Sequence, residues 1–115
     1  MNANLLSALA EPNRLRIIEL LREHPCSVGE IAERLSIRQP QVSKHLRVLS
    51  EAGLVEVHPS AQQRIYQLQP TPFKELDSWL GTFRRIWNAR LDNLDEYLQE
   101  LKQEHDESQH PHFDL

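Results

Sequence analysis

The chain has 115 residues, of which 39% are hydrophobic and 26% are charged. This composition is typical of one folded domain with a single modest core. No apolar run approaches membrane-spanning length, and the first residues lack the basic and long apolar stretches of a signal peptide. The single cysteine excludes an internal disulfide framework and fits a reducing compartment. We therefore expect a cytoplasmic domain without a membrane partner.

The formal net charge of −4 is divided unevenly along the chain. Residues 92–115 hold eight acidic residues and one lysine, a charge of −7, whereas residues 1–91 hold twelve basic and nine acidic residues, a charge of +3. The acidity therefore lies at the C-terminal end, and the rest of the chain is mildly basic. A negative total charge does not exclude nucleic acid as a partner.

The N-terminal segment is predicted to be scaffold. A short apolar stripe is formed by Leu5, Leu6 and Leu9. Glu11-Pro12 then begins a helix that runs to about Glu23, and His24-Pro25 ends it. The arginines of this helix are expected to be solvated. The residues expected on its buried face are Leu15, Ile18 and Leu21, with Ile17 and Leu20 beside them.

The first helix of a closely spaced pair is predicted to follow Ser27. Ser27 and Glu30 have the S-x-x-E spacing of a capping box, in which each side chain satisfies an unpaired amide at the helix start. Apolar residues recur from Val28 to Leu35 at the i, i+3, i+4, i+7 intervals of one helix face. Residues 36–38 interrupt this pattern, which indicates a three-residue turn.

A second helix is predicted over about 39–52, with Pro40 at its start, where a missing N–H costs nothing. Gly53 supplies the left-handed residue just past its end. Its buried face is formed by Val42, Leu46 and Leu49. Polar side chains on its outward face and near its N-terminal end are candidates for DNA contacts: Arg38, Gln39, Gln41, Ser43, Lys44 and Arg47. Between Ser36 and Ser50 there is no acidic residue.

Periodicity alone does not prove DNA binding, because two packed helices of any small helical domain show the same pattern. The segment that follows the two helices favours DNA binding. Residues 54–58 and 64–68 are rich in β-branched and large apolar residues, and the polar stretch 59–63 between them indicates a hairpin loop. A helix-turn-helix followed by a hairpin, here at about 54–69, is the winged helix arrangement.

The segment from Leu35 to Leu54, with QPQVSKHLRVL and EAGLV, resembles the ArsR family of bacterial winged-helix transcriptional repressors. The similarity extends upstream to ALAEPNRLRI at 8–17 and downstream to ELDSWL at 75–80 and RLDNL at 90–94. The resemblance implies a mainly α fold with a small β-hairpin that dimerises through its N- and C-terminal helices. It also implies a homodimeric, sequence-specific repressor that binds double-stranded DNA at a promoter inverted repeat, its own promoter included.

Roles for the polar side chains follow from the chemistry of the DNA grooves. Gln39 and Gln41 can offer amide pairs to adenine, and Lys44 or Arg47 can meet a guanine or a phosphate. Ser43 is short enough to lie against the DNA backbone. Arg64, at the base of the wing, is expected to contact the flanking groove or a phosphate. His45 is expected to be structural.

Two positions depart from the family pattern. Members usually place Ser or Thr before the Gln-Pro pair, where it caps the recognition helix, whereas this chain has Arg38. That side chain caps poorly and is a candidate for phosphate binding. The wing loop also lacks the usual glycine and second arginine.

A long last helix is predicted over about 72–104, with Thr71 as its N-cap and Pro72 as its first residue. At ~1.5 Å per residue it is ~50 Å long, more than the small module can cover, so its apolar stripe needs a partner. The alternative is a helix folded back on its own core. Gly81 is expected to permit a kink or a close helix approach. The predicted dimer interface comprises Leu5, Leu6, Leu9, Trp79, Phe83, Trp87, Leu91 and Leu94. Residues 105–115 are expected to be a disordered, acidic, His-containing tail.

Neither metal site best known in the family is expected. Its paired cysteines would lie near Ser27 and Gly29, and its second site needs histidines on the last helix, which has none before His105. Cys26 is instead expected to pack onto Ile31 as a hydrophobic staple. No cofactor motif is present, and an enzyme is the least favoured class, because the sequence has no Gly-rich phosphate loop and no nucleophile elbow.

Two alternatives stay open at this point. One is a winged-helix protein-interaction module whose second helix never meets DNA. The other is a thiol- or metal-responsive regulator that uses Cys26 or the tail histidines His105, His110 and His112. The sequence does not specify an inducer.

Overall fold

The computed structural model describes residues 3–107, with side chains described over residues 3–104. It divides into two units, one up to Asp77 and one from Ser78 onward. In the described part of the chain, no helix is both long enough and apolar enough to cross a membrane. The elements, in chain order, are α1 (Ala3–Leu9), α2 (Pro12–Glu23), β1 (Cys26–Ser27), α3 (Val28–Leu35), α4 (Gln39–Glu51), β2 (Val55–Ser60), β3 (Gln63–Leu68) and α5 (Pro70–Glu107).

Helix α2 has the predicted bounds and is fixed at its start by side-chain hydrogen bonds. The carboxylate of Glu11 accepts a hydrogen bond from the backbone N–H of Arg14 at 2.8 Å. The guanidinium of Arg14 donates to the carbonyl oxygens of Ala8 at 2.7 Å and Ser7 at 3.3 Å, near the C-terminal end of α1. The prediction that the arginines of this helix are merely solvated is therefore wrong for Arg14, and also for Arg16, which donates to a carbonyl of α3, because carbonyls at a helix end attract a cation.

The helix-turn-helix forms as predicted, with α3 and α4 separated by three residues. The Ser27 hydroxyl accepts a hydrogen bond from the backbone N–H of Glu30 at 3.2 Å. Ser36 ends α3 in the left-handed region at φ 55, a conformation in which glycine is usual. The Arg16 guanidinium donates to the Leu35 carbonyl at 3.0 Å, so α2 also holds the end of α3.

Helix α4 ends in a Schellman motif in which Gly53 is the left-handed residue, as predicted. Gly53 has φ +76, and the Leu54 N–H donates to the Leu49 carbonyl at 2.9 Å. At the other end, Arg38 occupies the N-cap and makes no capping hydrogen bond with its side chain in the described structure. Helix α4 ends at Glu51, so the predicted end at about residue 52 lies one residue beyond the observed helix.

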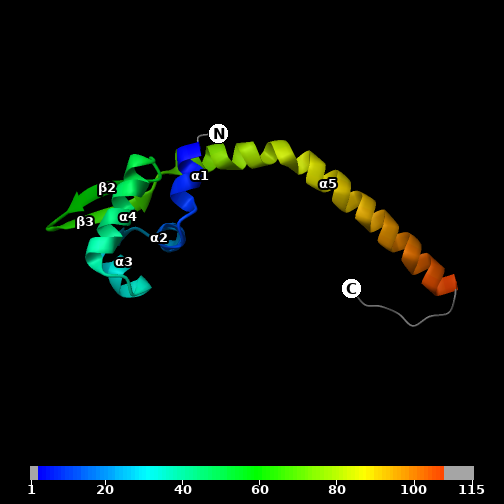
Figure 1. The fold of residues 1–115 in the computed structure, drawn as a ribbon, viewed down its shortest axis with the longest axis horizontal. Coiled ribbons are helices and arrows are strands. Elements are labelled where there is room, and N and C mark those ends of the chain that lie inside the picture. Colours follow the sequence, from blue (N-terminus) through cyan, green and yellow to red (C-terminus); the bar gives the residue numbers. More distant parts are fainter. Residues whose placement is uncertain (1–2, 108–115) are drawn as a thin grey trace. The chain divides into compact units, whose positions relative to one another are not determined.

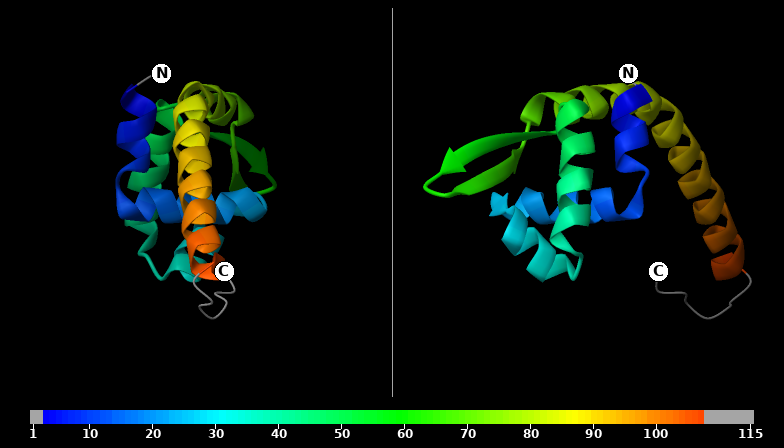
Figure 2. Two further views of the ribbon diagram at one scale, coloured as in Figure 1. Left: turned by 90° about the vertical axis from the view of Figure 1, so that its right-hand side faces the viewer. Right: turned by 60° about the vertical axis from the view of Figure 1, so that its left-hand side comes forward.

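The sheet has three antiparallel strands in the order β1–β3–β2, one more than the sequence predicted. Cys26 pairs with Tyr66, so β1 joins the start of α3 to the wing. The hairpin loop is shorter than the predicted 59–63, because the strands extend to Ser60 and resume at Gln63. Its first residue, Ala61, has φ 54. The hairpin β2–β3 extends beyond the helices of its unit in the views of Figure 1 and Figure 2.

The core lies between α1, α2, α3, α4 and the root of the sheet. Val42, Leu46 and Leu49 of α4 are fully buried, as predicted. Leu15 is 43% exposed, which contradicts its predicted place on the buried face of α2, where Ile17 and Leu20 lie instead. The buried set is Leu5, Ala8, Ile17, Ile18, Leu20, Leu21, Cys26, Ile31, Ala32, Val42, Leu46, Leu49, Leu54 and Val55.

Helix α5 is longer than predicted at both ends, since it begins at Pro70 and runs to Glu107. Thr71 is therefore inside the helix and is not its N-cap. In the first unit, Phe73 and Leu76 pack against the core. The helix includes the first three residues of the predicted tail, and residues 108–115 lie outside the described residues.

Replacing Leu46 by alanine tests whether α4 is anchored by its buried face. We expect Leu46→Ala to lower the free energy of unfolding by about 2–5 kcal/mol, because the deletion leaves a cavity beneath α4. Leu15→Ala, at an exposed position of α2, is the control and should cost less than about 1 kcal/mol. Urea denaturation at one fixed protein concentration measures both. Equal losses would contradict this account of the core.

The empty N-cap of α4 predicts a stabilising substitution. Arg38→Ser should raise the free energy of unfolding by about 0.5–2 kcal/mol, because a serine hydroxyl can accept a hydrogen bond from the first turn of α4. Arg38→Ala removes the same charge without adding a cap and should give no such gain. Thermal unfolding of the three proteins measures the difference. If serine and alanine behave alike, the capping argument is wrong.

Candidate nucleic-acid interface

Burial of one face of α4 leaves its polar face exposed. Val42, Leu46 and Leu49 point into the core, and the helical period of 3.6 residues turns the positions between them toward solvent. All six polar residues predicted to contact DNA from this region are exposed: Arg38, Gln39, Gln41, Ser43, Lys44 and Arg47. The geometry therefore provides a polar helix face without an acidic residue before Glu51.

Two cations on this face are available to an anionic partner. Arg47 donates through Nε to the carboxylate of Glu51 at 3.3 Å, and both side chains are mostly exposed, at 83% and 69%. Such an exposed pair is worth only ~0.3–0.5 kcal/mol, so a phosphate or a base can replace Glu51. Lys44 is exposed and has no ion pair with the described residues.

Gln39 lies closer to α3 than the other polar residues of α4. A Cβ atom added at Gly29 would lie 3.7 Å from the Gln39 side-chain nitrogen, so this amide lies over the first turn of α3. A groove-facing role for Gln39 thus requires its side chain to turn away from α3, whereas Gln41 lies two residues further along α4 and is exposed. The two glutamines are not equivalent, which their spacing in the sequence does not reveal.

His45 is half-buried, as expected for a structural residue. Its Nδ1 atom lies 3.7 Å from the Glu11 carboxylate, and its side chain is 20% exposed. The same carboxylate caps α2, so His45 connects α4 to the start of α2. It is not part of the exposed polar face.

The wing presents a cation near its tip. Arg64 is exposed and pairs with Pro59, one step from the Ser60–Gln63 pair that precedes the loop. The prediction that Arg64 lies at the base of the wing is therefore wrong, because the strands extend further toward the loop than the sequence indicated. A cation near the end of a projecting hairpin suits a phosphate beside the recognition helix.

The base of the wing is acidic. Glu56 accepts hydrogen bonds from the side-chain amides of Gln67 and Gln69, the latter at 2.8 Å, and lies 3.3 Å from His58 Nε2. The hydrogen bonds from Gln67 and His58 lower the pKa of Glu56 below its ordinary value, so its carboxylate stays charged at neutral pH. This carboxylate would repel a phosphate placed at the base of the wing. Sequence reasoning did not single out this cluster.

Cys26 is shielded from solvent. It is 1% exposed and belongs to the same core cluster as Ile31, its predicted neighbour. Burial, followed by hydrogen bonding to Glu30 and the charge of that carboxylate, raises the pKa of the Cys26 thiol to about 11. The thiol is therefore protonated at neutral pH, which makes it a poor nucleophile for oxidants.

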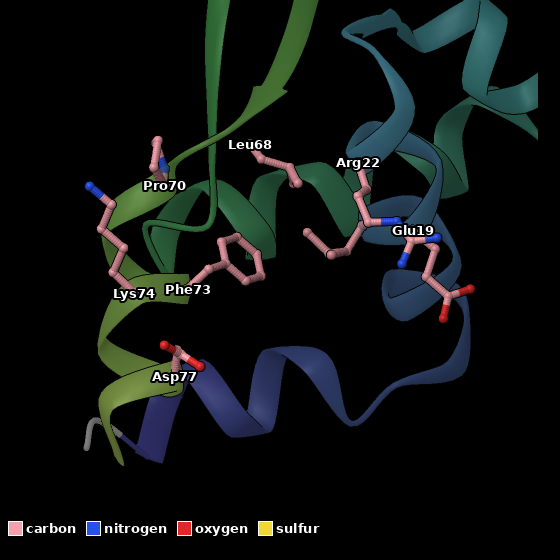
Figure 3. A pocket seen from close by; sticks show the side chains of 8 residues that line it. Glu19, Arg22, Leu68, Pro70, Phe73, Lys74 and Asp77 are labelled. Atoms are coloured by element: carbon pink, nitrogen blue, oxygen red, sulfur yellow. The ribbon is translucent and has the colours of Figure 1, made fainter. Parts of the chain in front are cut away.

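A cleft of about 600 Å³ lies away from the α4 face, between α2, the end of β3 and the start of α5. Figure 3 shows the Phe73 ring and Leu68 at its apolar wall, with Arg22 and Glu19 on one side and Lys74 on the other. Its mixed charges give it no preference for an anion over a cation. It therefore does not extend the candidate DNA surface.

The residues predicted to form a dimer interface differ in how much of each side chain is exposed to solvent. Leu5 is 3% exposed because it belongs to the chain's own core, so it has little surface left for a second protomer. Leu6 is exposed and Leu9 is half-buried. On α5 the rings of Trp79 and Phe83 form an edge-to-face pair with centroids 5.1 Å apart. The predicted interface residues of α5 that are exposed are Trp79, Phe83, Trp87, Leu91 and Leu94.

Comparison with known proteins identifies relatives with a helix-turn-helix domain. Residues 9–58 match the model of a helix-turn-helix domain. The chain is 42% identical to the HTH-type transcriptional regulator Rv2034 of Mycobacterium tuberculosis, over 73% of this chain and 76% of that protein. It is 31% identical to the transcriptional repressor SdpR of Bacillus subtilis, over 70% of this chain and 89% of that protein.

Solved structures of winged helix-turn-helix regulators have a similar fold. The ArsR family transcriptional regulator RHA00566 superposes with a TM-score of 0.65 and 26% identity, over 75% of this chain and 89% of that one. A homodimeric winged helix-turn-helix DNA-binding domain from Mycobacterium bovis, described as a possible ArsR-family regulator, gives a TM-score of 0.61 and 26% identity, over 71% of this chain and 76% of that one. The chain belongs to the ArsR family of winged helix-turn-helix transcriptional regulators.

Proposed function

We propose that this regulator is a repressor that binds a promoter inverted repeat as a homodimer, its own promoter among the targets. The observation that carries the proposal is the exposed, acid-free polar face of α4, which is held outward by three fully buried residues. A helix of this kind reads base edges in the major groove through its N-terminal half. Several relatives are named repressors, which supports repression over activation, and one relative is named a transcriptional activator.

Within this proposal, each polar residue has a distinct role. Gln41, and Gln39 once its side chain leaves α3, pair with bases, and Ser43 lies against the DNA backbone. Lys44 and Arg47 meet a guanine or a phosphate, while Arg38 and Arg64 bind flanking phosphates. Occupation of the operator excludes RNA polymerase from the promoter. The site of action is the cytoplasm, where the bacterial chromosome lies.

Dimerisation supplies the symmetry of the operator. On α5 beyond Asp77, exposed apolar residues recur every three or four positions from Phe83 to Leu98. Residues of this size rarely stay exposed in such a row on a monomer, so we infer that a second copy covers them. Leu6 and Leu9 of α1 contribute to the same interface. Two copies related by a two-fold axis place two α4 helices on half-sites one helical turn, or a multiple of it, apart.

Fluorescence anisotropy tests the DNA-binding proposal. Labelled DNA from upstream of the gene is titrated with protein over a salt series, with scrambled DNA of equal length alongside. Binding should prefer the upstream DNA and weaken as salt rises, because each phosphate contact releases a counterion. Equal affinity for both DNAs would contradict regulation of its own promoter. No affinity for any DNA would favour a protein-interaction module.

Lys44→Ala and Arg47→Ala test whether α4 is the surface that binds. Each should weaken specific binding by ~1–3 kcal/mol if the cation contacts a base, or lower the salt slope by about one if it contacts a phosphate. Lys102→Ala is the matched control, because this exposed lysine lies in the acidic part of α5. It should change neither quantity. Variants on α4 that bind like the parent protein would show that another surface contacts DNA.

Trp87→Glu tests the dimer interface. Trp87 is 49% exposed in the single chain, so the change should leave the fold intact but place a charge in the interface and produce monomers. Asn88→Glu, at the adjacent exposed polar position, adds the same charge and should stay dimeric. Sedimentation equilibrium distinguishes the two. A dimer that survives Trp87→Glu would remove the α5 stripe from the interface.

A further inference from the structure

Three side chains of different chemistry converge near the point where α2, β1 and α3 meet. His24 is the residue that ends α2, Cys26 lies in β1, and Glu30 lies in the first turn of α3. One ligand atom from each side chain lies within 4.8 Å of the other two. The Cys26 sulfur is 3.5 Å from His24 Nδ1. No other group of three such donors is this close in the part of the chain where side chains are described.

The donor set identifies a class of cation. Zinc binds thiolate sulfur at ~2.3 Å and imidazole nitrogen at ~2.0 Å, and in a tetrahedral site two such ligands lie about 3.5 Å apart. The observed sulfur–nitrogen separation therefore already matches a zinc site. One sulfur, one nitrogen and one carboxylate oxygen also exclude magnesium and calcium, which take oxygen ligands.

The three side chains differ in burial: Cys26 is buried, whereas Glu30 and His24 are accessible to solvent. Cys26 is 1% exposed and is held by its pairing with Tyr66 in β3, so its sulfur has little freedom. Glu30 is half-buried and His24 is exposed, so these two side chains can close on an ion that enters from solvent. Three protein ligands leave a fourth position, which water or a small anion can take.

A metal ion that binds here must replace existing contacts of His24 and the proton of the Cys26 thiol. His24 Nδ1 lies 2.9 Å from the Pro25 carbonyl oxygen, so ligation through Nδ1 requires this hydrogen bond to break and the proton to move to Nε2. The carboxylates of Glu23 and Glu30 attract a cation toward Cys26, and the Arg34 guanidinium opposes it. The bound ion takes the place of the thiol proton, which passes to solvent.

We propose that His24, Cys26 and Glu30 bind one divalent cation of the zinc class, with an exchangeable fourth ligand. The site differs from the thiolate pair best known in the family, because positions 27 and 29 are serine and glycine here. It uses none of the histidines of the C-terminal tail as ligands. The bound ion joins β1, which pairs with the wing, to the first turn of α3 in the helix-turn-helix.

Cobalt(II) titration of the reduced full chain tests the site. Cobalt occupies zinc sites and gives an intense near-ultraviolet absorption band only when a thiolate binds it. We expect one equivalent to bind with this band, and zinc to remove the band by competition. Cys26→Ser should abolish it. His24→Ala and Glu30→Gln, both at positions that are not buried, should weaken cobalt binding ~10-fold or more, while His58→Ala should leave it unchanged.

The control for the tail is a variant in which His105, His110 and His112 are all replaced by alanine, which should retain the band. Circular dichroism establishes that each variant is folded. Absence of the band in the parent protein would overturn the proposal. So would a band that persists at full affinity in folded His24→Ala and Glu30→Gln, because the thiol would then bind cobalt without the other two ligands.

Discussion

The structure depends on the burial of one face of α4. Val42, Leu46 and Leu49 are completely removed from solvent, and each buried aliphatic side chain contributes roughly 1.5–3 kcal/mol of transfer free energy. Because a helix is rigid over its length, fixing one face also fixes the direction of the other. The outward direction of Gln41, Lys44 and Arg47 is thus a consequence of core packing. Of the two cations Lys44 and Arg47, only Arg47 has an ion pair within residues 3–104, and that pair is exposed.

Side chains from α2 connect the elements that surround α4. Arg14 binds carbonyls near the end of α1, and Arg16 binds the last carbonyl of α3. Glu11, which caps α2, also lies beside His45 of α4. The two arginines satisfy carbonyl oxygens near the C-terminal ends of α1 and α3, where the helix itself leaves carbonyls unpaired. Helix α2 is therefore the support on which the helix-turn-helix is positioned.

Much of this architecture could be predicted from the sequence, because it follows from local rules. The periodic apolar residues of α3 and α4 predicted their buried faces, and Gly53 and Pro40 predicted where α4 ends and begins. The exposure of the α4 polar residues followed from the same periodicity. Residue spacing within one element was sufficient for each of these predictions.

The missed features depend on contacts between elements. Strand β1 is only two residues long and exists through its pairing with β3, so no alternating pattern marks it. Leu15 fits the apolar spacing of α2, yet the helix turns Ile17 and Leu20 inward. Similarly, His24 was interpreted as part of a helix stop signal, and its distance from Cys26 and Glu30 depends on how α2, β1 and α3 meet. Leu5 appeared free for a partner because the sequence does not show that α1 packs on its own core.

The most direct test of the central claim, that the polar face of α4 reads DNA sequence, is selection of binding sites from a random DNA library. The parent protein should enrich an inverted repeat whose half-sites are about 10 base pairs apart, centre to centre, or a multiple of that. Gln41→Ala should lose the base preference at one position of each half-site and keep it elsewhere. Failure to enrich any sequence, or the same preferences in both proteins, would contradict the claim.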